Sequence, residues 1–530
     1  MKPWQRSAAF LAALALGAAL AYLPAAGLGW VWDDFNLVQP SPAIQDLGGL
    51  GRAISTDLYR QAAPRLEASP YWRPLALASY WLDTRFGQAP GALHVGNLLL
   101  HALATALLAL VLWRRAGPVT GVATAALAAA WWSLHPENVE PVAWISCRYD
   151  LLCALAIIGL LALPWRPGAG RAALHGLLFL AGLLSKDGFG AMLVVLAALD
   201  WSERRPLRAA LPGWAAIAGA LAVWWLARAA LGLPGFGTPP LLPLARVYLD
   251  AARIYFQRAI AAPPLTISHP YAPAGALGSA IGAAVVLGLA AAALWRRRLA
   301  APVTLFLAGL VPAAVAIGKF GEVSERYFYL PSLGLALLVG ELVAASLASP
   351  RPLRRLALPV VVGLVATFGL VRVEARLPDW QSDTALFTAA VRIDPEDGQA
   401  NLQLGIEAGR RGDWAEARRA LEIAQRADPD SGRIAGALAW ALLRTHDAPG
   451  AIRQAERATA AAPRQPDGWY YLALARHAAG DHAGELAALE RLLQASPDYP
   501  SVHRLREHAA CEASGRTDCG AGPRPGEGAQ

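Results

Sequence analysis

The chain has 530 residues, of which 55% are hydrophobic and only 16% are charged, and its formal net charge is +8. This composition excludes an ordinary soluble globular protein and favours a membrane protein. The positive charge does not indicate nucleic-acid binding. Much of the arginine stands in doublets and triplets at the ends of apolar runs, where the positive-inside rule places it.

The sequence divides into two parts of different class. Long apolar runs alternate with short basic or aromatic stretches in the first part, and a polar, alanine-rich part follows. We expect an all-α protein in which a polytopic membrane helix bundle over 1–376 is followed by a repeat domain over 377–508. The last residues, 509–530, are expected to form a flexible tail.

A spanning helix needs about 20 mostly apolar residues, and eleven segments of the first part approach that length. They are 7–28, 92–113, 118–134, 150–165, 172–185, 188–201, 209–231, 275–295, 301–318, 328–348 and 356–373. We interpret the first as a retained helix and not as a cleaved signal peptide, because the residues after it continue the membrane domain.

The arginines predict the orientation of these segments. If the N-terminus is cytoplasmic, every expected inner loop is basic, as at Arg114 with Arg115 and at Arg296 to Arg298. An odd number of spans then places everything after residue 373 on the external face. We expect that face to be the periplasmic side of a bacterial inner membrane.

Three stretches between the spans have apolar or charged residues at helical spacing. The segments 46–62 and 71–86 in the first external loop predict helices that lie along the membrane surface. The stretch 244–262 carries four charged residues at helical spacing, which predicts an interfacial or a re-entrant helix.

Prolines recur every 34 residues in the second part, which is the period of tetratricopeptide repeats. They are Pro395, Pro429, Pro463 and Pro497. Trp380 and Trp414 are also 34 residues apart, which predicts that the array begins with a half repeat. Each unit is a helix pair, and stacked units form a concave groove. The groove predicts docking of a protein or peptide, and a structural cap on the membrane domain is the alternative.

Cys511 and Cys519 lie in the expected tail. An oxidising external compartment permits a small disulfide loop between them. Two unpaired thiols are the alternative.

An acidic pair, Asp33 and Asp34, directly follows the first apolar segment. Adjacent carboxylates at a membrane surface repel each other and lose hydration, which raises one pKa. Such a carboxylate suits a general base that removes a proton from a hydroxyl group. The alternative is a helix N-cap, which the spacing alone favours.

Other polar side chains fall on the same expected external side. His94, Asn97 and His101 share one helix face, which predicts that they face a cavity or a partner helix. Cations and carboxylates in the later loops suit an anionic, lipid-linked substrate, and solvated loop charges are the alternative. No spacing is diagnostic of a metal site, and no Walker loop or dinucleotide fingerprint is present.

Ordered motifs carry a resemblance to a known family. They are WDDF, YWRPL, HVGNLLLH, HPENVEPVAWISCRYDLL, LLSKD, SERYFYLPSLG and WQSDTALFTAAVRIDP. In this order they resemble the transmembrane and tetratricopeptide-repeat O-mannosyltransferases and their bacterial relatives, which are fold-C glycosyltransferases that use polyprenyl-phosphate sugars. Asp187 stands where the family pattern has glutamate, and Tyr149 where a small residue is usual.

The resemblance implies inverting transfer of a hexose, expected to be mannose, to a hydroxyl of an external protein. Asp33 or Asp34 would be the base, and no cofactor is required, with a divalent cation left open. The implied ligands of the lipid phosphate are Arg73, His135, Arg148, Lys186 and Arg326. His94, Glu140 and Glu325 complete the expected site.

Two other functions remain open at this point. One is a non-catalytic membrane scaffold that assembles an envelope complex through its repeats, for which the acidic pair would be dispensable. The other is a related enzyme that acts on a glycolipid or polysaccharide, for which the repeats would be only structural.

Overall fold

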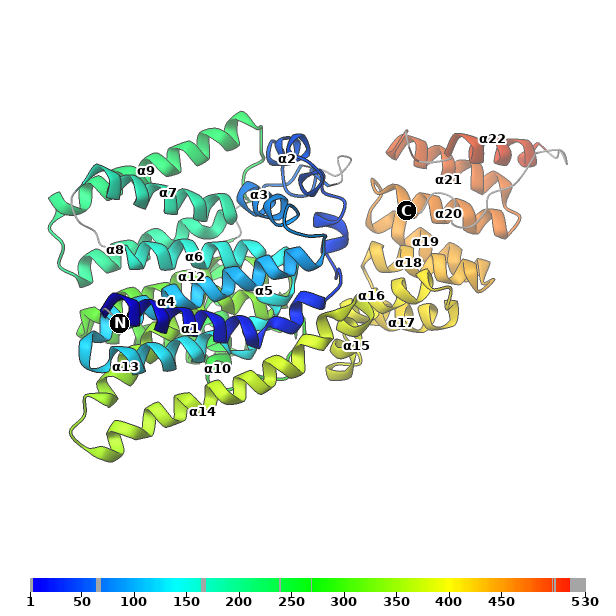
Figure 1. Cartoon of the computed structure of the whole chain (residues 1–530). Coiled ribbons are helices and arrows are strands. Elements are labelled where there is room, and N and C mark those ends of the chain that lie inside the picture. The colour runs from blue at the N-terminus through cyan, green and yellow to red at the C-terminus, as the bar shows by residue number, and fades with distance from the viewer. Residues whose placement is uncertain are drawn as a thin grey trace. The chain divides into compact units, whose positions relative to one another are not determined.

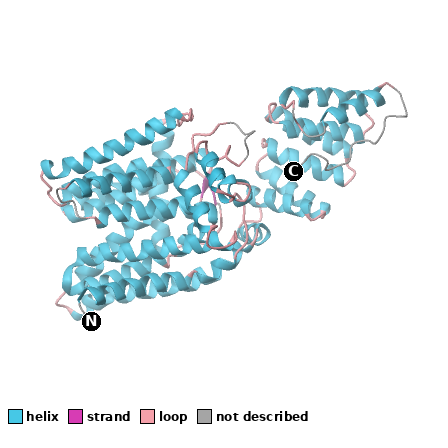
Figure 2. Cartoon of the chain, turned by 45° about the horizontal axis from the view of Figure 1, so that its top comes forward, coloured by secondary structure: helices cyan, strands magenta, loops and turns pink. Residues whose placement is uncertain are grey.

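The computed structural model describes residues 3–62, 68–163, 168–237, 240–267, 269–497, 499 and 502–514. The chain divides into two compact units, one that ends at Ser382 and one that begins at Asp383. The described secondary structure is almost entirely helical, as expected, with one small two-stranded sheet (Figure 2).

The first unit is a bundle of long helices (Figure 1). Its α-helices are α1 (Pro3–Ala21), α2 (Leu47–Ile54), α3 (Pro74–Asp83), α4 (Gly91–Ser133), α5 (Val139–Ala143), α6 (Arg148–Ala162), α7 (Ala169–Ser185), α8 (Leu193–Ser202), α9 (Leu207–Ala230), α10 (Leu241–Ile260), α11 (Ala276–Trp295), α12 (Ala300–Phe320), α13 (Tyr329–Leu347) and α14 (Pro352–Arg376). Short 3₁₀ or π turns lie between them: η1 (Leu23–Gly27), η2 (Asp34–Val38), η3 (Pro42–Ile44), η4 (Pro136–Asn138), η5 (Ile145–Cys147), η6 (Asp187–Met192), η7 (Arg297–Leu299), η8 (Glu325–Phe328) and η9 (Leu377–Gln381).

Seven helical segments of the described residues are long and apolar enough to span a membrane. One of them, α4, has 43 residues, which is about 65 Å of helix and twice the thickness of a membrane core. Gly117, with φ of 80°, interrupts α4 before Pro118 and divides it into two spans. The helices α1, α7 and α8 are not among these segments. With α4 counted as two, a helix lies in each of the eleven expected segments, and the crossing of the membrane by all eleven stays a prediction.

The expected span 188–201 differs from the sequence prediction at its start. It begins as the 3₁₀ turn η6 and becomes α-helical only at Leu193. Gly188 and Gly190 explain this, because glycine disfavours the α-helix by about 1 kcal/mol relative to alanine.

The outer helices of the bundle expose large apolar side chains. Trp225 of α9, Leu287 of α11 and Leu364 of α14 are each about two thirds exposed in the isolated chain. Side chains of this kind on helices of this length face lipid in a bilayer. The unit is therefore an all-α membrane bundle.

The helices expected outside the spans are present but differ from the prediction in extent or setting. α2 and α3 are shorter than the segments 46–62 and 71–86. α10 packs against α11, where Gly282 lies close to the backbone of Leu249. Its Asp250 is buried and accepts a hydrogen bond from the Tyr271 hydroxyl at 2.7 Å. α10 is thus part of the bundle, because its charged face has partners there.

The two strands join loops that are distant in sequence. β1 (His269–Pro270) pairs antiparallel with β2 (Glu322–Val323), with His269 opposite Val323. The pairing holds the loop after α10 against the loop after α12, at the end of the bundle that carries the acidic pair.

The second unit consists of stacked helix pairs, as the 34-residue period predicts. Its helices are α15 (Asp383–Ile393), α16 (Gly398–Arg410), α17 (Trp414–Ala427), α18 (Gly432–Arg444), α19 (Ala448–Ala461), α20 (Pro466–Ala478), α21 (His482–Ala495) and α22 (Val502–Ala513). Each second helix of a pair begins after an aspartate that accepts a backbone N–H three residues on, as Asp413 does from Glu416.

Two details at the ends of this unit differ from the sequence prediction. Trp380 is fully buried in the membrane unit, where it stacks on Trp144, and does not belong to a half repeat. α22 continues to Ala513, beyond residue 508, because Val502, Leu505 and Ala509 bury one apolar face. Cys519 lies outside the described residues, so its disulfide with Cys511 stays a prediction.

Close contact between α12 and α13 yields a stability prediction. A Cβ atom at Gly334 would lie 2.4 Å from the backbone nitrogen of Phe306, whereas one at Gly288 in α11 would meet nothing within 4 Å. We expect Gly334→Ala to destabilise the protein by about 1–3 kcal/mol through overpacking. Gly288→Ala, the matched control, should leave thermal unfolding in detergent unchanged or slightly improved. Equal unfolding midpoints for the two variants would contradict the helix packing described here.

Candidate active site

The acidic pair lies at the start of the π-helical turn η2. Asp34 is fully buried (0% exposed). Its Oδ1 accepts hydrogen bonds from the backbone N–H and the hydroxyl of Ser146, at 2.9 and 2.5 Å, and its Oδ2 accepts the Val31 N–H at 3.2 Å. Both carboxylate oxygens therefore point into the protein and tie the first loop to η5.

Asp33 is in a different environment from its neighbour. Its side chain is partly exposed, and although it occupies the N-cap position of η2, it makes no side-chain cap hydrogen bond. The N-cap interpretation therefore does not describe either carboxylate.

The burial of Asp34 changes its acidity. Burial raises the pKa of Asp34 to about 7, while the hydrogen bonds from Ser146 and Val31 oppose the shift and the charge of Asp33 adds to it. A carboxyl group with this pKa carries a proton for part of the time at neutral pH.

A stack of aromatic rings fixes the backbone next to the acidic pair. Trp32 has a left-handed backbone with φ of 51°, which is strained for a large side chain. Its ring stacks on Trp144, with centroids 4.9 Å apart and planes at 13°. Trp144 in turn stacks on Trp380 at 6.3 Å. These contacts hold the segment in which Asp33 lies.

Arg326 lies over this aromatic stack. Its guanidinium carbon is 5.5 Å from the ring centre of Trp32 and 5.3 Å from that of Trp144. Glu140 accepts from Nη1 of Arg326 at 2.6 Å and from its backbone N–H at 2.8 Å. Glu322 lies 3.3 Å from Nη2. Burial raises the pKa of Glu140, and the charge of Arg326 opposes that shift.

A second group of charges surrounds Tyr149. The guanidinium of Arg73 lies 3.6 Å from the centre of the Tyr149 ring, and its Nε is buried without a hydrogen-bond partner. Lys186 lies 5.3 Å from the same ring and pairs with Asp150 at 2.5 Å. The tyrosine that departs from the family pattern therefore stands between two of the predicted phosphate ligands.

Asp187 also belongs to the second group. It pairs with Arg228 of α9 at 3.0 Å. Burial raises the pKa of Asp187 to about 6, against the lowering effect of Arg73 and Arg228. Asp150 and Asp187 each pair with a cation through one carboxylate oxygen, and the other oxygen of each is buried without a hydrogen-bond partner.

Charges from both groups act on the hydroxyl of Tyr59. The pKa of Tyr59 is raised chiefly by burial and further by Asp33, while Arg73 and Arg326 both lower it. These three charges therefore lie within electrostatic range of a single hydroxyl. Lys319 extends the site, because its Nζ is 3.1 Å from the hydroxyl of Tyr71.

Several predicted site residues are buried inside the fold. His94 is 1% exposed, and its Nε2 lies 3.1 Å from the Gly29 carbonyl oxygen, so it holds the first loop against α4. Burial lowers the pKa of His135 to about 3. His135 is thus neutral, and its Nδ1 accepts the N–H of Glu137. Its role as a phosphate ligand stays a prediction.

Arg148 departs from its predicted role as a phosphate ligand. It is fully buried, and its Nε donates to Asn97 at 2.7 Å. Its other two nitrogens donate to Asp83, Ser79 and the Leu93 carbonyl oxygen. Because each nitrogen is already engaged, Arg148 joins α3, α4 and α6 and does not face a ligand.

Glu325 belongs to a buried network next to the site. It accepts from Nη2 of Arg376 at 3.1 Å, and Arg376 also pairs with Asp379 at 2.8 Å. Nearby, Glu137 pairs with Arg258 of α10 at 2.9 Å. These pairs neutralise charge in the bundle and connect α14 and α10 to the loops of the site.

Sequence reasoning missed three residues of this site. Ser146 fixes Asp34, Trp144 carries the aromatic stack, and Arg228 pairs with Asp187. Ser146 and Trp144 stand within the motif HPENVEPVAWISCRYDLL, which was a signal that the whole segment lies at the site. Arg228 was counted only as part of an apolar span.

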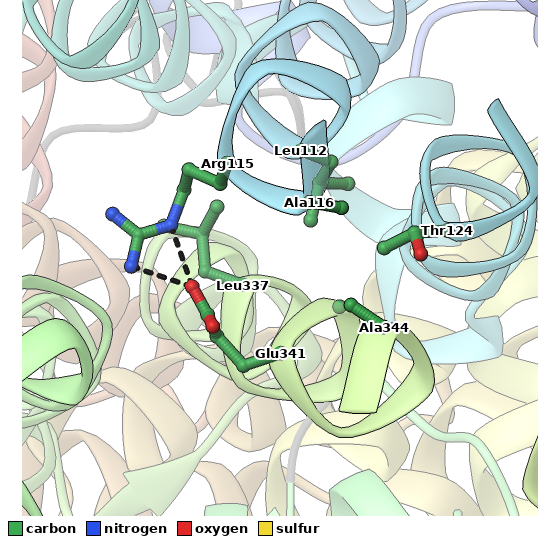
Figure 3. A pocket seen from close by; sticks show the side chains of 8 residues that line it. Leu112, Arg115, Ala116, Thr124, Leu337, Glu341 and Ala344 are labelled. Atoms are coloured by element: carbon green, nitrogen blue, oxygen red, sulfur yellow. Dashed lines mark hydrogen bonds and ion pairs between the residues drawn. The ribbon is translucent and has the colours of Figure 1, made fainter. Parts of the chain in front are cut away.

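A pocket at the opposite end of the bundle is separate from this site (Figure 3). It lies about 30 Å along α4 from His94 and includes Arg115, whose Nε and Nη2 donate to Glu341 at 3.0 and 2.8 Å. Leu112, Leu337 and Ala344 form its apolar wall. The ion pair joins α4 to α13, so we assign this pocket to helix packing.

Comparison with known proteins gives two kinds of match. A family model described as "Tetratricopeptide repeat" matches residues 402–455 and 437–500. Two Drosophila melanogaster proteins are each 30% identical to part of the chain. "Protein O-mannosyl-transferase Tmtc2" matches over 191 residues, which are 34% of this chain and 20% of that protein. "Protein O-mannosyl-transferase Tmtc1" matches over 188 residues, which are 33% of this chain and 21% of that protein. The chain spans about a fifth of the length of these relatives.

The raised pKa of Asp34 predicts how the stability of the protein depends on pH. Its pKa is higher in the folded than in the unfolded protein, so its contribution to stability is complete at pH below 4 and is lost as the pH rises to about 7. Asp34→Asn mimics the protonated form at every pH. The difference in unfolding free energy, variant minus wild type, should therefore increase from pH 4 to pH 7 by about 4 kcal/mol at most and then level off.

Thermal unfolding of both proteins across this pH range measures the difference. Asp46→Asn is the control, because Asp46 only caps α2 through the Gly49 N–H and asparagine caps equally well. A pH-independent difference for Asp34→Asn would contradict the buried, protonated state described here.

Proposed function

Because part of the chain is related to the O-mannosyl-transferases Tmtc1 and Tmtc2, we propose that it is a membrane glycosyltransferase that moves mannose from a polyprenyl-phosphate donor to a hydroxyl of an external protein. The observation that carries the proposal is the site itself. A partly exposed carboxylate, Asp33, directly follows Trp32, whose ring lies under the guanidinium of Arg326, and the charges of Asp33, Arg326 and Arg73 all act on the hydroxyl of Tyr59.

The proposed reaction is a single displacement at the anomeric carbon. Asp33 takes the proton of the acceptor hydroxyl, and the acceptor oxygen forms a bond to the anomeric carbon. The bond from that carbon to the phosphate oxygen breaks, and its electron pair leaves with polyprenyl phosphate. Attack opposite to the leaving group inverts the anomeric configuration. No nucleotide or other cofactor takes part in these steps.

We assign the role of general base to Asp33 because its carboxylate is the more accessible of the two. A general base must reach the proton that it removes, and this geometric condition comes before the match of pKa values. Asp34 has the more suitable pKa, but it is 0% exposed and both of its oxygens accept hydrogen bonds from the protein. Asp34 therefore acts as a positioning residue that fixes Asp33 through η2.

The phosphate of the donor is assigned to Arg73, Lys186 and Arg326. Arginine and lysine stabilise the charge that develops on a departing phosphate, and each of these three side chains is partly exposed. The buried Nε of Arg73 lacks a hydrogen-bond partner, which favours a ligand oxygen as its partner.

The orientation follows from the distribution of arginine. Arg115 and Arg298 lie at the end of the bundle opposite to the site, where Nη2 of Arg298 donates to the Arg115 carbonyl oxygen. The positive-inside rule places that end in the cytoplasm. The site and the repeats, which follow the last span, then lie on the external side, where the repeats recruit the protein acceptor.

The acidic pair provides the test of the reaction. With purified protein and polyprenyl-phosphate mannose, Asp33→Asn should lower turnover by about 10²–10⁴-fold, the usual contribution of a general base. Asp34→Asn should lose less, because asparagine can still accept from Ser146. Asp46→Asn should keep wild-type turnover, as it changes a carboxylate of the same loop that only caps a helix.

Two outcomes would contradict the proposal in different ways. Full activity of Asp33→Asn with inactive, folded Asp34→Asn would reverse the assignment of the base. A wild-type protein that is inert toward several lipid-phosphate sugars, with both variants still complementing a deletion strain, would favour the non-catalytic scaffold.

The domain boundary provides the test of the acceptor. Truncation after Ser382 removes the repeats but keeps Trp380, which is buried in the membrane unit. We expect the truncated protein to hydrolyse the donor at the wild-type rate but to lose transfer to the protein acceptor. Donor hydrolysis and protein mannosylation are measured in parallel, after gel filtration confirms a folded bundle. Unchanged transfer to a glycolipid or polysaccharide would favour the related enzyme in which the repeats are only structural.

A further inference from the structure

Histidines and glutamates from three helices converge at the C-terminal end of the repeat unit. His477 belongs to α20, His482 and Glu485 to α21, and Glu512 to α22. One nitrogen or oxygen atom from each of the four lies within 4.8 Å of all the others. The four residues are 35 positions apart in sequence at the extremes, so the fold brings them together.

The separations match those of ligands around one small cation. Nδ1 of His477 is 3.0 Å from Oε2 of Glu485 and 3.3 Å from Oε2 of Glu512. Nδ1 of His482 is 3.6 and 3.0 Å from the same two oxygens. Bonds of 2.0–2.1 Å in a tetrahedral zinc site place neighbouring ligand atoms about 3.3 Å apart.

The pattern of hydrogen bonds also indicates a missing partner. Nδ1 of His482 and Oε2 of Glu512 are buried and have no hydrogen-bond partner, although they lie 3.0 Å apart. Nδ1 of His508, 3.4 Å from Glu512, is also without one. The nearby cation Arg476 donates to the Gly484 carbonyl oxygen and pairs with Glu456, which is outside the group.

The position of Glu485 in the repeat gives an independent argument. The equivalent positions 34 and 68 residues earlier are Ala451 and Ala417, both buried small residues at helix contacts. Glu485 is 1% exposed at this position. A charged group replaces a small apolar one there, and burying it is unfavourable unless a cation compensates it.

We propose that His477, His482, Glu485 and Glu512 bind a divalent transition-metal ion, with Zn²⁺ the best fit. Imidazole and carboxylate ligands in tetrahedral arrangement suit zinc. The ion would join α22 to α20 and α21 and so close the open end of the repeat array. His508 would orient Glu512 from outside the ligand set. The inference does not depend on the proposed transferase activity.

Without a metal, a proton would take over part of this compensation. The hydrogen bond to Glu485 raises the pKa of His477, so a protonated imidazole would face the two carboxylates. The experiment must therefore detect the metal itself, and stability alone is not a sufficient measurement.

The test uses the full chain, without an affinity tag, in detergent after treatment with a chelator and dialysis. Titration with Co²⁺ should give the strong visible absorption of a four-coordinate ion, saturating at one Co²⁺ per chain, and Zn²⁺ should abolish the bands. The double variant His482→Ala/Glu512→Gln should lose the stoichiometric bands. His503→Ala is the control, because it removes an exposed histidine of α22, the helix that carries Glu512. This variant should bind Co²⁺ like the wild type.

Zinc should also raise the unfolding temperature of the wild type and of His503→Ala but not of the double variant, since binding to the folded state stabilises it. The proposal is overturned if the wild type shows no four-coordinate Co²⁺ spectrum. It is equally overturned if the double variant, with the circular dichroism of a folded protein, binds one ion as the wild type does.

Discussion

The membrane unit depends on the mutual neutralisation of charges that are buried at one end of an apolar bundle. An unpaired charge in such surroundings is strongly unfavourable, and removing one partner of a buried pair costs about 3–5 kcal/mol. Glu137, Glu140 and Glu325 are all fully buried, and each has an arginine partner from another segment. The loops between spans therefore have few ways to arrange themselves, because each of these three glutamates must meet its arginine.

This constraint explains why a reactive arrangement can exist in loops. Loops usually lack rigid positions, but here Arg326 is fixed by Glu140 and by the faces of Trp32 and Trp144. Asp34 fixes the first loop through Ser146 in the same way. Buried neighbours fix the positions of the groups that remain partly exposed, and Asp33 is one of these groups. The proposed reaction on a charged lipid donor needs such preorganised groups, because they stabilise developing charge without rearranging.

Periodic features of the sequence predicted most of the fold. The apolar segments predicted the positions of the long helices of the bundle, since burial in lipid imposes length and composition on a spanning helix. The 34-residue period predicted the repeats because each unit must present the same small residues to the next. Trp380 was assigned to the wrong unit, because its spacing from Trp414 is that of a repeat while its contacts are with Trp144.

The division of the polar residues into exposed and buried groups was beyond the sequence. The order of the motifs predicted Arg73, Arg148 and Arg326 alike as phosphate ligands at one face. Only the fold shows that the nitrogens of Arg148 already donate to Asn97, Asp83 and Leu93. The spacing of His135 likewise does not reveal that burial keeps its imidazole neutral. Long-range packing decides these questions, and a single sequence does not report it.

The same physical criterion underlies both candidate sites. Glu140 in the bundle and Glu485 in the repeats are each buried where an apolar side chain would be less unfavourable. Glu140 has a cation of the protein itself, Arg326, as its partner. Glu485 faces two imidazoles and a second carboxylate. The chain therefore places more negative charge than fixed positive charge around this point. A buried carboxylate whose compensation is incomplete within the chain indicates a partner from outside it, and in the repeat unit the ligand spacing fits a metal ion.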